Sequence, residues 1–230
     1  MNRRPMLVSL HLPKTAGTSF AETLRAASGA GYRADYGDLP MQHGPWRRRW
    51  DAIRGGRTLR HLLPEGRGCV HGHFLAMKYR IALAGRPAMF ITWLREPTQR
   101  LASHYAFWRR DYDGSDPAQP LRNRMLREDW SFERFALGPE MRNVYRQYLW
   151  GVDPARFDFI GITEYYQADL RRLVSMLGCE PVEAAALVNP DSGGEAYDVE
   201  PALQARIERF HAADYALYRQ ALARRSAWSR

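Results

Sequence analysis

The sequence predicts an α/β fold with a central parallel sheet flanked by helices. Apolar runs without polar alternation occur at residues 6–10, 88–94 and 157–163, and such runs are typical of strands buried on both faces. Each run is followed by a segment with helical periodicity, and this alternation favours parallel strands covered by helices. The length of 230 residues suits one such unit, so we expect a single domain over residues 1–230.

The other elements follow from apolar periodicity and from Gly or Pro at their ends. We expect a weak strand at residues 68–71, and we place strand 88–94 at the centre of the sheet because it is the most apolar. We expect helices at residues 18–25, 46–53, 75–84, 97–108, 143–149 and 201–221, one ending at 177, and two short ones within 121–137. Loops are expected at residues 29–45, 111–120 and 189–194.

The net charge of +9 and the pI near 9.9 indicate an anionic partner, such as nucleic acid, acidic glycan, anionic lipid or nucleotide. Arg richness from coding bias and solubility explains the same charge equally well. The hydrophobic content of 45% argues against global disorder. Charge therefore does not select a function by itself.

The two cysteines, Cys69 and Cys179, are far apart and show no Cys or His spacing typical of a zinc site. We expect two free, partly buried thiols in a reducing compartment, and no bound metal. The apolar run after the N-terminus is too short for a signal peptide or a membrane span. We therefore expect a soluble, cytoplasmic protein with no transmembrane segment.

Residues 13–19 predict a site for a phosphate or sulfate group. A strand that passes through a small-residue turn into a helix leaves backbone N–H groups unpaired at the helix N-terminus, where the helix dipole favours negative charge. The donors expected in this anion loop are the amides of residues 15–19, among them Ala16 and Gly17, and the hydroxyls of Thr15, Thr18 and Ser19. A tight turn with a solvated Lys14 is the alternative.

Lys14 distinguishes this loop from that of nucleoside-triphosphate enzymes, which place Lys after the last Gly of G-x-x-x-x-G-K-[ST]. Here Lys14 precedes Gly17 and lies at the mouth of the turn. Of the 34 Lys and Arg residues only Lys14 and Lys78 are Lys, which leaves 34 − 2 = 32 Arg. In a chain so biased toward Arg, Lys at position 14 indicates a single-point contact rather than a planar fork.

A second candidate anion contact is Arg95 with Ser103. Arg95 ends the strand at residues 88–94, where open α/β sheets place ligand contacts. Ser103 lies within two turns of the following helix, so both side chains are expected near one anion at its N-terminus. Pairing of Arg95 with Glu96, and a Ser on the side of a helix, is the alternative interpretation.

Together these motifs resemble those of sulfotransferases, and the resemblance implies a P-loop-like nucleotide-binding fold. Pro13-Lys-Thr-Ala-Gly-Thr-Ser-Phe20 resembles the 5′-phosphosulfate loop, and Leu94-Arg-Glu-Pro-Thr-Gln-Arg-Leu-Ala-Ser-His-Tyr105 resembles the 3′-phosphate motif. His71-Gly-His73-Phe74 is similar to carbohydrate sulfotransferases of the heparan sulfate 2-O type and their bacterial relatives. Ala16 stands where many relatives carry Gly, and the chain is shorter than the animal enzymes, which favours a smaller acceptor.

The resemblance implies that 3′-phosphoadenosine 5′-phosphosulfate (PAPS) donates its sulfuryl group to an acceptor hydroxyl. The desulfated product is 3′,5′-bisphosphoadenosine (PAP), and a binding experiment can use it in place of the donor. It implies that Lys14 stabilises the leaving oxygen and that His73 is the general base, with His71 as helper. A carbohydrate or glycolipid acceptor is expected, without metal or nucleic acid. Asn143 and Gln147 fit either ligand contact or a polar helix face.

Two other classes of function remain open at this point. A P-loop kinase-like phosphotransferase uses the same strand, loop and helix, but the G-x-x-x-x-G-K spacing is missing. A non-enzymatic basic module for nucleic acid or acidic glycan accounts for the net charge and for the Arg-rich segment 46–54.

Overall fold

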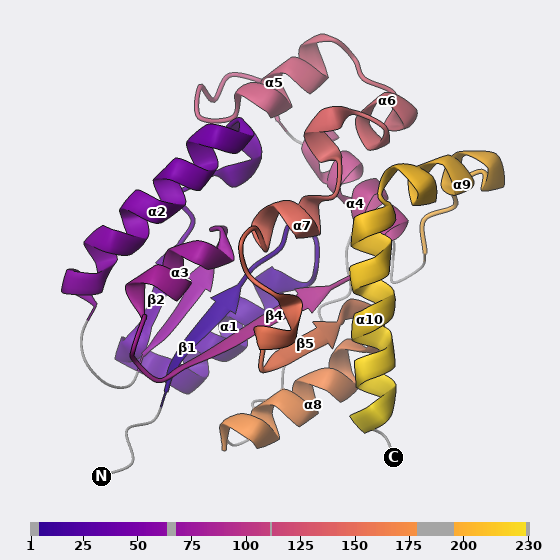
Figure 1. Cartoon of the computed structure of the whole chain (residues 1–230). Helices are drawn as coiled ribbons and strands as arrows, with labels where there is room; N and C mark the ends of the chain where they lie inside the picture. The colour runs from indigo at the N-terminus through magenta and orange to yellow at the C-terminus, as the bar shows by residue number, and fades with distance from the viewer. Residues whose placement is uncertain (1–4, 64–67, 111, 179–195, 229–230) are drawn as a thin grey trace.

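The computed structural model describes residues 5–63, 68–110, 112–178 and 196–228. Five parallel strands form one sheet in the order β2-β3-β1-β4-β5 (Figure 1). The strands are β1 Met6–Leu10, β2 Tyr32–Asp35, β3 Cys69–Gly72, β4 Ala88–Leu94 and β5 Phe159–Ile162. The predicted α/β class with a central parallel sheet is confirmed.

The middle strand of the sheet is β1, and every one of its residues is buried. Leu10 at its end lies in register with Gly72 of β3 and Thr92 of β4. The prediction that residues 88–94 form the central strand is therefore wrong, because β4 lies next to the middle strand. The bounds of β4 agree with the predicted range. Because all strands are parallel, the segments after β1, β3 and β4 emerge at one edge of the sheet.

Helices cover both faces of the sheet, as Figure 1 shows. They are α1 Gly17–Ser28, α2 Pro45–Leu62, α3 Ala76–Ala82, α4 Pro97–Arg109, α5 Pro120–Arg127, α6 Phe132–Ala136, α7 Val144–Tyr148, α8 Tyr166–Leu177, α9 Pro201–Phe210 and α10 Ala212–Trp228. One core layer packs the sheet against α3, α7 and α10, and the opposite layer packs it against α1 and α8. A third cluster joins α4, α5, α6 and α9 beyond the edge.

Three expectations from the sequence need correction. The expected loop at 29–45 contains the edge strand β2, whose half-exposed residues give no apolar run. The helix expected at 46–53 extends to Leu62, because Gly56 allows α2 to cross α3 closely: a Cβ there would lie 2.5 Å from the carbonyl oxygen of Lys78. The single helix expected at 201–221 is divided into α9 and α10 at His211.

His211 explains that division. Its Nε2 donates to the carbonyl of Ala136 at 2.7 Å, and its Nδ1 accepts the backbone N–H of Asn143 at 3.1 Å. A buried imidazole fixed on both sides determines where the chain turns between the two helices.

Cys69 is a buried free thiol, whereas Cys179 and the loop expected at 189–194 lie outside the described residues. Within the described ranges no helix combines the length and apolar character needed to cross a membrane. In the same ranges there is no group of three or more His, Cys, Asp or Glu side chains suited to a metal ion.

Candidate functional site

The anion loop leaves β1 at Leu10 and enters α1 through two residues in the left-handed conformation. Lys14 has φ 65° and Ala16 has φ 63°, values that cost an L-residue about 1–3 kcal/mol each. Ala16 is the N-cap of α1, and its carbonyl accepts the N–H of Phe20 at 3.2 Å. The amides of Gly17 and of the two residues after it precede this first intrahelical bond, as an anion site at the N-terminus of α1 requires.

The hydroxyl of Thr15, which the sequence predicts as a ligand donor, is engaged within the loop in this structure. Thr15 is buried, and its Oγ1 donates its single hydrogen to the carbonyl of Leu12 at 2.9 Å. The side chain thus holds the loop closed on itself. The side chains of Thr18 and Ser19 lie outside the described part of the structure.

Lys14 lies among positive charges. Its Nζ is 4.3 Å from the centre of the Phe107 ring. Partial burial, with the charges of Arg110 and Arg95 adding to it, lowers the pKa of the Lys14 ammonium to about 8. Near neutral pH this lysine is a cation close to its titration point, in a cluster suited to a multiply charged anion.

The His71 side chain is buried inside the sheet edge. Its Nδ1 is 2.8 Å from the hydroxyl of Ser9, and its Nε2 has no hydrogen-bond partner in the described structure. Burial, with the charge of a protonated His73 adding to it, lowers the pKa of His71 to about 4. His71 is therefore neutral at pH 7 and does not reach solvent.

His73, just beyond β3, has a different environment. It is partly exposed, and its Nδ1 lies 2.6 Å from the backbone carbonyl oxygen of His11. A carbonyl only accepts, so Nδ1 carries the hydrogen and Nε2 holds the free lone pair. Burial lowers the pKa of His73 below its usual value, so the ring is a neutral base at pH 7.

His11 is the residue that sequence reasoning missed. Its ring lies 4.2 Å from that of His73 and 5.0 Å from that of His71, centre to centre. Its Nδ1 shares a hydrogen bond of 3.0 Å with the hydroxyl of Tyr36. A Cβ added to Gly17 would lie only 1.8 Å from the Nε2 of His11, so the ring packs directly against the start of α1. The available signal was its position immediately after β1.

Arg95 and Ser103 are both near the end of β4, but their side chains differ in access. The main chain of Arg95 is held by Tyr145, whose hydroxyl accepts its N–H at 3.1 Å and donates to its carbonyl at 2.6 Å. The Arg95 side chain is partly exposed, and the charge of its guanidinium contributes to lowering the pKa of Lys14. Ser103 is fully buried, and its Oγ has no hydrogen-bond partner within the described residues.

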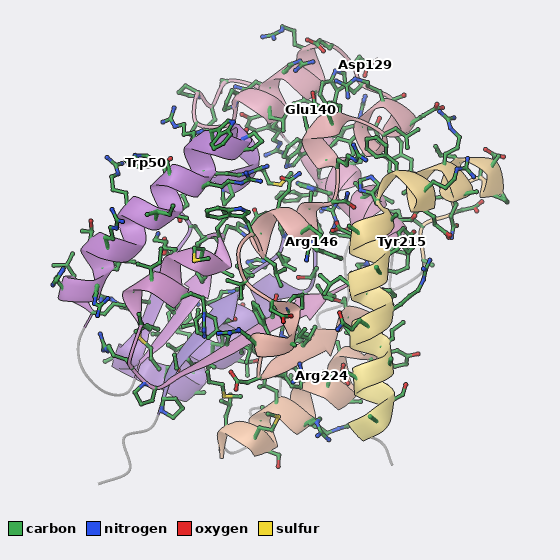
Figure 2. All side chains as sticks on the ribbon, viewed as in Figure 1. Trp50, Asp129, Glu140, Arg146, Tyr215 and Arg224 are labelled. Atoms are coloured by element: carbon green, nitrogen blue, oxygen red, sulfur yellow. The ribbon has the colours of Figure 1, made fainter. Side chains whose placement is uncertain are left out.

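Asn143 and Gln147 border a cleft of about 570 Å³ between α2 and α7, lined also by Arg48, Arg49, Arg146 and Trp150. Of these residues, Figure 2 labels Arg146. The Oδ1 of Asn143 accepts the N–H of Asp214 at 3.3 Å. Gln147 accepts from Arg48 and donates to the carbonyl of Arg142. Their polar atoms thus hold the fold around this cleft.

No protein-family model and no curated protein matches the sequence. The solved structures that are similar in shape include the following three. A sulfotransferase from Alicyclobacillus acidocaldarius is 16% identical with a TM-score of 0.49, covering 99% of both chains. Mouse sulfotransferase SULT7A1 complexed with PAP is 13% identical with a TM-score of 0.40, covering 90% of this chain and 64% of that chain. An uncharacterized protein from Eubacterium ventriosum is 14% identical with a TM-score of 0.39, covering 76% and 99%. Because these values are low, we base function on this chain's own residues.

Proposed function

We propose that the protein is a sulfotransferase that moves the sulfuryl group of PAPS to an acceptor hydroxyl. The observation that carries the proposal is that the carboxyl-terminal ends of β1 and β3 lie next to each other in the sheet. There the Lys14 loop follows Leu10, and His73 follows Gly72, which is paired with Leu10 in the sheet. An ammonium and a neutral imidazole, the two groups that sulfuryl transfer needs, thus follow paired strand ends.

The residues divide the reaction between them. The acceptor oxygen forms a bond to sulfur while the bond from sulfur to the 5′-phosphate oxygen breaks. His73 Nε2 takes the proton of the acceptor hydroxyl, because its Nδ1 is occupied by the carbonyl of His11. Lys14 stabilises the charge that develops on the leaving oxygen. His71 and His11 position His73 rather than exchange protons with the acceptor.

The site fits the charge of PAPS. The free amides at the start of α1 suit the 5′-phosphosulfate group. We assign Arg95 and the buried Oγ of Ser103 to the 3′-phosphate, since this hydroxyl has no hydrogen-bond partner among the described residues and a ligand would supply one. The acceptor is proposed to be a carbohydrate or glycolipid of the kind used by the heparan sulfate 2-O type and its bacterial relatives.

A kinase-like function has less support. The acidic pair Asp35 and Asp38, at and after the end of β2, is bound to Lys78 at 2.8 and 2.7 Å rather than available to Mg²⁺. A non-enzymatic module that binds nucleic acid or acidic glycan through its positive charge does not require a neutral His73 with a fixed tautomer.

The test is binding followed by transfer. Calorimetry should show that PAP binds more tightly than ATP with Mg²⁺, and labelled PAPS should transfer sulfate to members of a panel of glycans, glycolipids and alcohols. His73→Ala should retain PAP affinity and lose about 10²–10⁴-fold in turnover, the range for a general base. His61→Ala, at an exposed histidine of α2, is the matched control. Absence of PAP binding would contradict the proposal.

A further inference from the structure

Helix α2 presents two tryptophans to solvent. Trp46 is 84% exposed and Trp50 is 63% exposed. They are four residues apart, so their side chains leave the helix about 40° from each other on one face. Single exposed apolar residues are ordinary, but two indoles on adjacent turns form a patch that calls for a partner. Figure 2 shows Trp50 at the outer margin of the molecule.

Arginines surround the two indoles. Arg47, Arg54, Arg57 and Arg60 are all exposed. The single acidic residue of the helix, Asp51, lies 3.7 Å from Arg47 and 3.8 Å from Arg54, distances that leave both guanidinium groups largely hydrated. By helical periodicity Arg57 lies between the two tryptophans around the axis, about 17 Å along it from Trp46. The exposed face of α2 thus carries the two indoles in its first two turns, with arginines beside them and further along the helix.

The opposite face of α2 holds the helix firmly. Ala52 and Gly56 are buried against α3, and the close contact of Gly56 with the carbonyl of Lys78 leaves no space for sliding. The indoles are therefore displayed on a rigid element. The arginine-lined cleft is bordered by Arg48 and Arg49 of the same helix and by neither tryptophan.

We propose that the exposed face of α2, defined by Trp46, Trp50, Arg54 and Arg57, docks on an anionic lipid bilayer. Indoles favour the boundary between headgroups and acyl chains, and arginines are attracted to acidic headgroups. The face is a convex helix at the margin of the molecule, a shape that meets a flat surface (Figure 1). Double-stranded nucleic acid would use the arginines and leave the indoles without a role. Bases of a single strand could stack on the indoles, and the experiment below distinguishes such a ligand from a bilayer.

Docking in this way would bring the cleft between α2 and α7 close to the lipid surface, since Arg48 and Arg49 belong to the same helix. The surface proposal does not rest on the sulfotransferase proposal. If both hold, a lipid-linked acceptor reaches the protein from the side on which it is docked.

The test is co-sedimentation of the full chain with vesicles of phosphatidylcholine alone and of phosphatidylcholine with phosphatidylserine. Binding to the mixed vesicles is expected, with weakening as salt rises. Arg54→Gln with Arg57→Gln should weaken it roughly 30-fold, about fivefold for each charge. Trp46→Ala with Trp50→Ala should weaken it roughly tenfold or more. All four positions are exposed, so thermal unfolding should be unchanged.

The matched control removes exposed groups from α8, on another side of the molecule, by Arg171→Gln, Arg172→Gln and Met176→Ala. This variant should bind the mixed vesicles within about twofold of the unmodified chain. Equal binding to both vesicle types, or no effect of the tryptophan pair, would overturn the proposal. So would binding to heparin or DNA that depends on Trp46 and Trp50 without binding to vesicles. PAP affinity measured on the same variants separates this result from any failure of the proposed enzyme function.

Discussion

Substitution of Gly17 by Ala tests whether His11 links the anion loop to the base. A Cβ at position 17 would lie 1.8 Å from Nε2 of His11, 2.0 Å from Cδ2 and 2.4 Å from Cε1. The ring would have to retreat by roughly 1.5–2 Å to restore van der Waals contact. It cannot do so freely, because the rings of His73 and His71 lie 4.2 and 5.0 Å away.

The expected cost of this overpacking is about 1–3 kcal/mol of unfolding free energy. For a chain of this length it corresponds to a fall of about 2–12 °C in the unfolding midpoint. Because His11 also supports His73 through its ring and its carbonyl, sulfuryl transfer should fall by about 10²-fold, the effect of a displacement near 1 Å.

The measurement is a double-mutant cycle with thermal unfolding and PAP calorimetry as readouts. In a His11→Ala background the space opposite Gly17 is vacated, so Gly17→Ala should then cost less than about 0.5 kcal/mol, and the coupling should be about 1–3 kcal/mol. Gly37→Ala, where an added Cβ meets nothing within 4 Å, is the control. An equal cost of Gly17→Ala in both backgrounds would refute the contact between the loop and His11.

Two further predictions concern the pH dependence of the proposed activity and the packing of α2 against α3. The ratio kcat/KM should fall as pH drops through the lowered pKa of His73, which must be neutral, and should fall again above pH 8, where Lys14 loses its proton, to about one tenth at pH 9. Lys14→Arg should remove the alkaline limb, and a limb that persists would assign it to another group. Gly55→Ala should be neutral or stabilising by up to about 1 kcal/mol, because the nearest atom to its Cβ is the flexible Cε of Lys78 at 3.3 Å. Gly56→Ala should destabilise by about 1–3 kcal/mol, and equal unfolding midpoints for the two variants would contradict the close crossing on α3.

The parts of the fold that were predictable from sequence are those whose burial is symmetric. Strands β1 and β4 have apolar residues on both faces, so composition alone defines their bounds. Strand β2 was missed because an edge strand needs pairing on one side only, and Tyr32–Asp35 are half-exposed. The bend at His211 depends on two distant backbone partners, which local periodicity does not reveal.

The site shows the same division. Turn and helix together predicted an anion loop. The structure shows that Lys14 and Ala16 in this turn are left-handed and that α1 begins at Gly17, while anion binding stays a prediction. Residue type alone did not show that the hydroxyl of Thr15 donates to the carbonyl of Leu12, because that hydrogen bond depends on the path of the turn. Nor did it separate His71 from His73. Their difference arises because His71 lies within β3 and packs against the rings of Phe20 and His11, while His73 lies beyond the end of β3.

The protonation states of Lys14 and His73 are set by the same features that would bind an anionic donor. Burial lowers both pKa values, which leaves His73 neutral and Lys14 still mostly protonated at pH 7. Arg95 and Arg110 lower the pKa of Lys14 in the free protein, and they are also the charges that attract a bisphosphate. Once a donor neutralises them, the pKa of Lys14 rises. On the proposed mechanism, Lys14 is therefore most firmly protonated in the complex, where the leaving oxygen requires its charge. The alkaline limb of kcat should consequently lie at higher pH than that of kcat/KM.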